Sequence, residues 1–281
     1  MTGSRGRTAV IAGRGGLPMQ LIAALEGAGA DPVLVALPGV TVEGAGDRTP
    51  ERVEIERLVP FFDRLHDLGV RQVTFAGAVT RPRLDPERFD PRTAQLLPRL
   101  VAAMQAGDDA TLRAVIGLFE EEDFDVLGAA ELVPDLLPGP CVLGQHHPDA
   151  DATRDATRAV AIVAALGAVD VGQGAVVARG LCLAVEALPG TDAMLAQVAA
   201  LPANLRGEGR AGVFYKAPKP GQDRRIDLPA LGPDTVRAAA AAGLAGIAFE
   251  AGGVLLLDRA RAVAEADAAG LFLWARPGPA P

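Results

Sequence analysis

The stretch TAVIAGRGGLP, residues 8–18, decides how the first half of the chain folds. TAVIA is a short apolar run typical of a buried strand, and GRGG is a glycine-rich turn. The residues that follow, 19–29, are apolar at helical spacing and end in glycine, which predicts a helix. A turn between a strand and the amino end of a helix is well placed to bind phosphate through backbone N–H groups.

The same alternation of strand and helix continues through the first half of the chain. Further strands are predicted at 32–37, 72–79 and 124–129, and helices at 55–69, 92–105 and 109–122. Strands that alternate with helices form parallel βαβ units, so residues 1–137 are predicted to form a Rossmann-like N-terminal domain. Ligands of such sheets bind beyond the carboxyl ends of the strands, where this chain carries GRGG and FAGAVTRP (75–82).

The second half of the chain has a different pattern. Residues 138–151 contain several prolines and glycines and are predicted to be a linker. Pairs of apolar runs around glycine predict two β-hairpins, one at 174–187 and one at 246–258. Helices are predicted before and between them, so residues 152–281 are expected to form a separate α+β domain. The fold class is therefore α/β with two domains.

Composition narrows the classes of function. A net charge of −8 and a pI near 5.0 argue against a nucleic-acid-binding protein, which would need a basic surface. No run approaches the ~18 apolar residues of a membrane span, and the first residues do not predict a signal peptide. Cys141 and Cys182 stand in unrelated contexts, so we expect two buried thiols in a reducing compartment rather than a disulfide or a zinc site.

The glycine turn does not match the dinucleotide fingerprint. Pro18 stands where that fingerprint needs its third glycine, and Leu37-Pro38-Gly39 stands where it needs an acid for the ribose. We therefore expect a phosphate or nucleotide loop of another kind, with a merely tight turn as the alternative. Arg81 suits a bidentate phosphate contact, with a surface arginine as its alternative. The candidate substrate-binding residues of the two loops are Gly13, Arg14, Gly15, Gly16, Leu17, Gly77, Val79 and Arg81.

The stretch KAPKPGQDRRIDLP, residues 216–229, is the strongest candidate for chemistry. Its prolines exclude a helix, and in an extended chain Asp223 and Asp227 lie ~13 Å apart, too far to share one metal ion unless the chain folds between them. One aspartate is therefore expected to serve a metal ion or a water, and the other a salt bridge or a cap. Lysine and arginine beside them suit a diphosphate. The candidate catalytic residues are Lys216, Lys219, Asp223, Arg225 and Asp227, and Gln222 is a candidate substrate contact.

Polar residues also flank the first predicted hairpin. Gln173 precedes it, Glu186 ends it, and Thr191 and Asp192 follow. We interpret all four as candidate substrate contacts, with helix caps and turns as the alternative.

Several motifs in a fixed order resemble one known family. They are IAGRGGLP, FAGAVTRP, GDDATLRAV, GAAELVPDLL, VDVGQGAVV, GLCLAVEALPGTDAML and KAPKPGQDRRIDLP. Together they are similar to the UDP-2,3-diacylglucosamine pyrophosphatases of the LpxI type, which act in lipid A synthesis in Gram-negative bacteria. Members of that family often carry a glycine where this chain has Arg14.

The resemblance implies a Mg²⁺-dependent hydrolase that cleaves UDP-2,3-diacylglucosamine to UMP and lipid X, 2,3-diacylglucosamine 1-phosphate. It implies a Rossmann-like and a second domain with the substrate between them. The family's essential aspartate lies in the motif that matches GQDRRID, which implies Asp223 as the catalytic and metal-binding residue, with Asp227 second.

A lipid substrate implies transient contact with the inner-membrane surface. We therefore expect a cytoplasmic protein that is peripheral at the cytoplasmic face, and we consider a homodimer. Two alternatives stay open: a non-catalytic protein that binds nucleotide sugars or lipids, and a nicotinamide-dependent oxidoreductase, against which Pro18 and the missing ribose acid argue.

Overall fold

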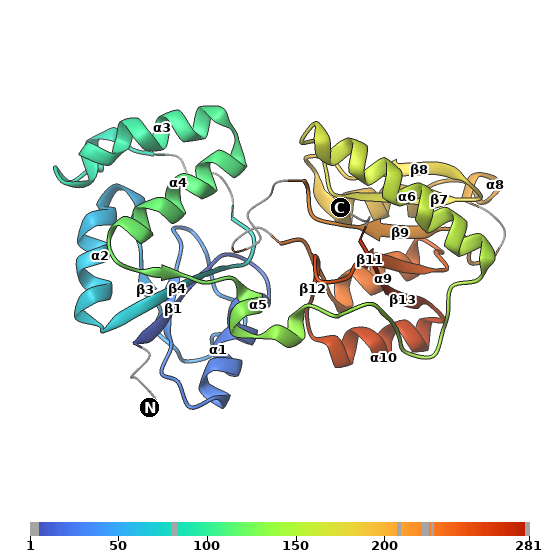
Figure 1. The fold of residues 1–281 in the computed structure, drawn as a ribbon, viewed down its shortest axis with the longest axis horizontal. Helices are drawn as coiled ribbons and strands as arrows, with labels where there is room; N and C mark the ends of the chain where they lie inside the picture. Colours follow the sequence, from blue (N-terminus) through green and yellow to red (C-terminus); the bar gives the residue numbers. More distant parts are fainter. Residues whose placement is uncertain (1–5, 80–83, 207–208, 221–224, 226–227, 279–281) are drawn as a thin grey trace. The chain divides into compact units, whose positions relative to one another are not determined.

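The computed structural model describes residues 6–79, 84–206, 209–220, 225 and 228–278 (Figure 1). The chain divides into two compact units. The N-unit comprises Met1–Pro134 with Asp223–Ile226, and the C-unit comprises Asp135–Gln222 with Asp227–Pro281.

The N-unit is built on a parallel five-stranded sheet with the order β3-β2-β1-β4-β5. Its strands are β1 (Arg7–Ala12), β2 (Val33–Ala36), β3 (Glu51–Arg52), β4 (Val70–Ala76) and β5 (Asp125–Val126). The chain runs outward from β1 through β2 to β3, and then returns to the other side of β1 for β4. The carboxyl ends of β1 and β4 thus flank the point at which the strand order reverses, which is where open α/β sheets bind their ligands.

Helices connect these strands and cover the sheet. They are α1 (Leu17–Gly27), α2 (Leu58–Asp67), α3 (Leu97–Ala106), α4 (Asp108–Glu121) and α5 (Ala129–Leu132), with short 3₁₀ turns at Ile55–Arg57, Pro86–Arg88, Thr93–Leu96 and Pro134–Leu136. The strands are almost wholly apolar because both faces of a parallel sheet are buried. In the core, Ile11 and Val73 pack with Phe62 of α2 and Phe119 of α4, and the two phenylalanine rings meet edge to face with centroids 4.9 Å apart.

The C-unit contains a mixed six-stranded sheet with the order β6-β13-β11-β9-β7-β8. Its strands are β6 (Cys141–Leu143), β7 (Gly174–Ala178), β8 (Leu181–Val185), β9 (Val213–Lys216), β11 (Gly246–Glu250) and β13 (Phe272–Arg276), and a separate parallel pair joins β10 (Ala230–Leu231) to β12 (Leu255–Leu256). The central strands β9, β11 and β13 are parallel, whereas β6 and β7 run antiparallel to their neighbours.

Two apolar cores form on the two faces of this sheet. The helices of the unit are α6 (Ala150–Ala168), α7 (Gly190–Ala199), α8 (Ala203–Arg206), α9 (Pro233–Ala241) and α10 (Arg259–Ala269). Alanines of α6 pack against Val177 and Tyr215 on one face. On the other face, α7, α9 and α10 pack against Val176 and Phe214. Within the described ranges, no helix is both long and apolar enough to cross a bilayer.

The first predicted hairpin is confirmed: β7 and β8 pair antiparallel around Arg179 and Gly180. Both turn residues have positive φ, 53° and 75°, as a two-residue turn that matches the twist of its strands requires. The carboxylate of Asp155 on α6 accepts hydrogen bonds from both of their N–H groups, at 2.9 and 2.7 Å. The buried acid therefore fixes an arginine in a conformation that normally favours glycine.

The second predicted hairpin is wrong. β11 pairs with β9 and β13, and β12 pairs with β10 in another sheet. Helices α9 and α10 lie between successive parallel strands, so the C-unit is a mixed α/β structure rather than one with separate strands and helices. A glycine-rich break between two apolar runs predicts a turn, but it does not say which strand pairs with which.

Two smaller expectations also change. The stretch 138–151, predicted to be a linker, contributes the edge strand β6. Cys141 and Cys182 are exposed, not buried. Both lie on edge strands of the sheet, β6 and β8, where one side of the strand is left uncovered.

Candidate functional site

Two glycine loops of the N-unit meet at the carboxyl ends of β1 and β4. The N–H of Arg14 donates to the carbonyl of Ala78 at 2.8 Å, and the N–H of Ala78 donates back to the carbonyl of Arg14 at 2.9 Å. A Cβ on Gly13 would lie 2.5 Å from the oxygen of Ala78, and one on Gly77 would lie 2.5 Å from the oxygen of Arg14. Glycine is therefore required at both positions, and the structure brings the two predicted loops together.

The first loop leads directly into helix α1. Gly16 is its N-cap residue, no side chain caps it, and no acid stands in its first turn. Gly15 has a φ of +95° and open space where a Cβ would stand, and Arg14 is exposed. The side chain of Leu17 is buried, so Leu17 has only its backbone to offer a ligand. This arrangement leaves the positive end of the helix dipole facing the loop.

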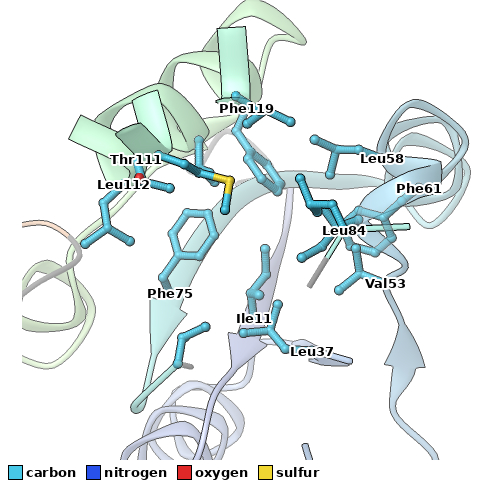
Figure 2. A pocket seen from close by; sticks show the side chains of 15 residues that line it. Ile11, Leu37, Val53, Leu58, Phe61, Phe75, Leu84, Thr111, Leu112 and Phe119 are labelled. Atoms are coloured by element: carbon cyan, nitrogen blue, oxygen red, sulfur yellow. The ribbon is translucent and has the colours of Figure 1, made fainter. Parts of the chain in front are cut away.

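An apolar cavity of about 170 Å³ lies next to these loops in the N-unit (Figure 2). Ile11 and Phe75 rise from β1 and β4 toward Leu112 and Phe119 of α4. The cavity presents only apolar surface, and its wall consists of Ile11, Leu37, Val53, Ile55, Leu58, Phe61, Phe75, Val79, Leu84, Leu100, Met104, Thr111, Leu112, Val115 and Phe119.

Val79 joins the glycine loop to the cavity. It follows Gly77 by two residues, the residue as a whole is 57% exposed, and it forms part of the cavity wall. The sequence singled out Val79 but gave no sign of the cavity, whose wall is drawn from residues 11 to 119. Arg81, the other candidate of this loop, lies outside the described residues.

The C-unit carries a polar cluster of a different kind, formed by Lys216, Glu186 and Thr191. Lys216 is the last residue of β9, Glu186 follows β8, and Thr191 lies in the first turn of α7. The Nζ of Lys216 donates to Oγ1 of Thr191 at 2.7 Å, and that hydroxyl donates to Oε2 of Glu186 at 2.9 Å. The Nζ and Oε2 atoms are 3.7 Å apart, and Lys216 and Glu186 are only 6% and 7% exposed.

The chain on either side of Gln173 is shaped around Glu186. A Cβ on Gly172 would lie 1.9 Å from the carbonyl oxygen of Glu186, and one on Gly174 would lie 2.6 Å from its Oε2. The Oε1 of Gln173 is buried and accepts no hydrogen bond within the described part of the chain. An unsatisfied amide oxygen in such a place is usually completed by a water or a ligand.

The remaining candidates of the C-unit are nearer the surface. Lys219 forms an ion pair with Asp170, with Nζ and Oδ1 2.6 Å apart. Asp192 is exposed on the first turn of α7. Helix α7 begins at Gly190 after Pro189, so the alternative interpretation of Thr191 or Asp192 as its N-cap is wrong. The Thr191 hydroxyl donates to Glu186 instead of capping the helix.

Arg225 belongs to the N-unit, although it follows the C-terminal lysines in the sequence. Its guanidinium lies 2.7 Å from Oε1 of Glu120 on α4. Its Cα lies 3.2 Å from where a Cβ on Gly128 would stand. The contacts described for Arg225 are therefore those with Glu120 and Gly128 of the N-unit. Gln222, Asp223 and Asp227 fall outside the described residues, and the described residues hold no group of three or more His, Cys, Asp or Glu able to bind a metal ion.

Tyr215, which precedes Lys216 on β9, shows that this part of the sheet is buried away from solvent. Its side chain is buried against α6. Burial, with a smaller contribution from the charge of Glu250, raises the pKa of Tyr215 to about 12.

The fold defines a two-domain α/β protein, with glycine loops and an apolar cavity in one unit and a buried lysine–carboxylate cluster in the other. The chain belongs to the LpxI family: the LpxI N-terminal domain matches residues 7–136, and the LpxI C-terminal domain matches residues 139–274. It is similar to the UDP-2,3-diacylglucosamine pyrophosphatase LpxI of Caulobacter vibrioides, with 42% identity over 277 residues, which cover 94% of this chain and 95% of that protein. The resemblance inferred from the ordered motifs is confirmed.

Proposed function

We propose that this protein is a UDP-2,3-diacylglucosamine pyrophosphatase of lipid A synthesis, which releases UMP and 2,3-diacylglucosamine 1-phosphate. The observation that carries the proposal is the apolar cavity beside the glycine loops, with Val79 both in its wall and exposed. A nucleotide sugar alone needs no such cavity, whereas a diacylated one has chains to bury. The near full-length similarity to the Caulobacter enzyme supports the same substrate.

In this proposal the N-unit recognises the substrate through the backbone of its two glycine loops. Arg14 is the one charged side chain in the described part of these loops. The backbone of Gly13–Leu17 and Gly77 faces phosphate or nucleotide at the amino end of α1. Acyl chains enter the cavity past Val79. The strand order, with both loops at its reversal point, supports a Rossmann-like interpretation of this unit.

The C-unit would supply the charges that hydrolysis of a diphosphate requires. Lys216 and Lys219 would offset negative charge on the phosphate oxygens, and the buried Oε1 of Gln173 would accept a hydrogen bond from the substrate or a water. Mg²⁺, when bound, neutralises charge on those oxygens.

Asp223 would hold the magnesium ion, with Asp227 as a second carboxylate. Magnesium is commonly bound through one or two carboxylates together with substrate phosphates and water, so a small set of protein ligands fits this ion. The carboxylates described in the C-unit cluster, Glu186 and Asp170, already pair with lysines. The proposal assigns the metal ion to Asp223, as the resemblance to the family implies, with Asp227 as the second candidate.

The diacylated substrate also supports a place of action at the cytoplasmic face of the inner membrane. We propose transient contact with that surface, through which the lipid chains of the substrate are taken up.

A UMP-release assay tests the function. We expect Asp223→Ala to lower the rate by about 10³-fold or more, with the melting temperature unchanged. The matched control, Asp47→Ala, removes an exposed carboxylate of the N-unit and should leave the rate unchanged.

A second test removes the metal ion: EDTA should stop the wild-type reaction, and added Mg²⁺ should restore it. Full activity in EDTA would exclude a role for a metal ion. Tight binding of the substrate without UMP release would favour a non-catalytic protein that binds lipids or nucleotide sugars.

A further inference from the structure

The chain uses arginine almost everywhere that it needs a positive charge. It contains 25 arginines and two lysines, and the two lysines are Lys216 and Lys219. Arginine presents a planar, delocalised fork, whereas lysine presents a compact ammonium on a flexible stem. Lysine at these two positions, in a sequence otherwise rich in arginine, indicates that a compact ammonium is needed there.

The surroundings of Lys216 are closely packed and almost fully buried. Lys216 is 6% exposed, and the neighbouring Glu186 is 7% exposed. The backbone of Gly174 lies close to this pair: a Cβ added to Gly174 would lie 2.6 Å from Oε2 of Glu186 and 2.9 Å from the ring of Phe214. Lys216 and Glu186 are therefore held in closely packed, almost fully buried surroundings.

The hydrogen bonds around Lys216 have a defined direction. The hydroxyl of Thr191 has one proton, which it donates to Glu186 at 2.9 Å, so its lone pairs are left to accept from Nζ of Lys216 at 2.7 Å. Glu186 lies 3.7 Å from the same Nζ and supplies the opposite charge. A buried charge persists only when it is paired and hydrogen-bonded, and this arrangement does both.

We propose that Glu186 and Thr191 are positioning residues for Lys216, which keep its ammonium charged and aimed in a nearly dry site. This inference rests on the proposed function in one respect, namely that the ammonium serves an anionic diphosphate. It assigns Glu186 and Thr191 to the lysine, where the sequence had suggested direct contact with substrate.

Other charged groups stand at the same end of the sheet and enter the design of the test. They are the Lys219–Asp170 pair, Asp192 on α7, and Glu250 at the end of β11, next to the partner of Lys216 in the sheet. Glu186→Gln keeps the shape of the side chain and removes one charge. The lysine ammonium then loses the compensation of Glu186, and its charged form becomes less favourable.

Lysine NMR reads this effect without any reaction. Selective ¹³Cε-lysine labelling gives only two lysine signals, and Lys219→Arg assigns them. In Glu186→Gln we expect the Lys216 signal to titrate at lower pH than in the wild type, while the Lys219 signal stays where it was. Thr191→Val should shift Lys216 in the same direction by less, and Thr191→Ser should restore the wild-type titration.

Kinetics gives the second readout. Glu186→Gln should lower kcat for UMP release by about 10- to 100-fold, as loss of a supporting residue typically does, with little change in KM. The loss should shrink as the pH is lowered and Lys216 regains its proton. Glu265→Gln, which removes a carboxylate paired with Arg237 and Arg261 far from this cluster in the sequence, is the control and should leave kcat unchanged.

The two readouts separate the two claims. Should Lys216 titrate identically in the wild type, Glu186→Gln and Thr191→Val, the positioning role is overturned, whatever the kinetics show. If Glu186→Gln does not fold, the Thr191 variants decide by the same criterion. Absence of UMP release by the wild-type protein would overturn the proposed function alone, because the NMR titration does not depend on it.

Discussion

The two units of this protein prepare a site by opposite means. In the N-unit, Gly13 and Gly77 let two backbones touch, and the neighbouring cavity is wholly apolar. In the C-unit, Lys216 and Glu186 form a buried ion pair. Gly172 and Gly174 pack so close to Glu186 that neither position has room for a side chain. In the proposed function, one unit binds lipid and binds phosphate through its backbone, and the other stabilises the charge that develops in hydrolysis.

This contrast has a consequence for mutation. Changes in the N-unit should act through shape, and therefore on stability and on binding of the acyl chains. Changes in the C-unit cluster should act through charge, and therefore on kcat and its pH dependence.

The largest stability effect is expected from Gly77→Ala. The new Cβ would lie 2.5 Å from the carbonyl oxygen of Arg14, at a φ of +91°. Strain and overlap together should lower the free energy of unfolding by about 2–5 kcal/mol. Denaturant unfolding measures the loss. Gly15→Ala is the matched control, because its φ is +95° but its Cβ meets open space, so it should cost only about 1–2 kcal/mol. Equal losses would show that the contact between the loops contributes nothing.

Filling the apolar cavity should affect binding rather than chemistry. Leu112→Trp places a larger ring in the cavity wall on α4 and should raise KM for the diacylated substrate by about tenfold or more, the equivalent of losing one or two buried methylenes. Hydrolysis of the deacylated UDP-sugar should be unchanged. A KM that rises equally for both substrates would place the acyl chains elsewhere.

Two arginines paired with neighbouring acids of α4 form a sharper comparison. Arg225 pairs with Glu120 and Arg99 with Glu121, each at 2.6–2.7 Å and each partly exposed. Replacing either by glutamine should change the free energy of unfolding by at most about 1 kcal/mol. Because Arg225 lies in the motif that we propose to be catalytic, we expect only Arg225→Gln to slow UMP release, by about tenfold. Equal rates in the two variants would make the Arg225 pair purely structural.

The smallest expected effect concerns Tyr215, the single tyrosine of the chain. Its pKa is raised to about 12, so its neutral form is favoured in the folded protein. The resulting stabilisation is complete below pH ~10, the ordinary pKa of tyrosine, and is lost as the pH rises toward 12. Absorbance at 295 nm follows this one phenol. Ionisation near pH 10 in folded protein would contradict its burial.

Much of the fold follows from the sequence because apolar runs and helical stripes report burial directly. The segment 8–12 is predicted as a strand and lies within β1, and the helix predicted at 55–69 contains α2. The pairing of β11 and the strand β6 could not be predicted. Both depend on neighbours distant in the sequence, and their apolar runs would look the same in other sheets.

Some features of the candidate site could likewise be predicted from the sequence, and others could not. Gly13 and Gly77 can be identified from the sequence as glycines of loops that follow strands, and the structure joins the two loops through Arg14 and Ala78. Their contact with substrate stays a prediction. The partnership of Glu186 with Lys216 was not visible, because 30 residues separate them and only the sheet brings them together. The cavity left no local signal either. The roles of Asp223 and Asp227 stay predictions.

The central claim is that the protein hydrolyses the diphosphate of a diacylated UDP-sugar. Phosphorus NMR of the reaction with UDP-2,3-diacylglucosamine and Mg²⁺ in ¹⁸O-labelled water tests it most directly. The account predicts loss of the diphosphate signals and growth of two phosphomonoester signals, UMP and the diacylglucosamine 1-phosphate, one of them carrying ¹⁸O. A diphosphate that stays intact while the substrate is bound would contradict it.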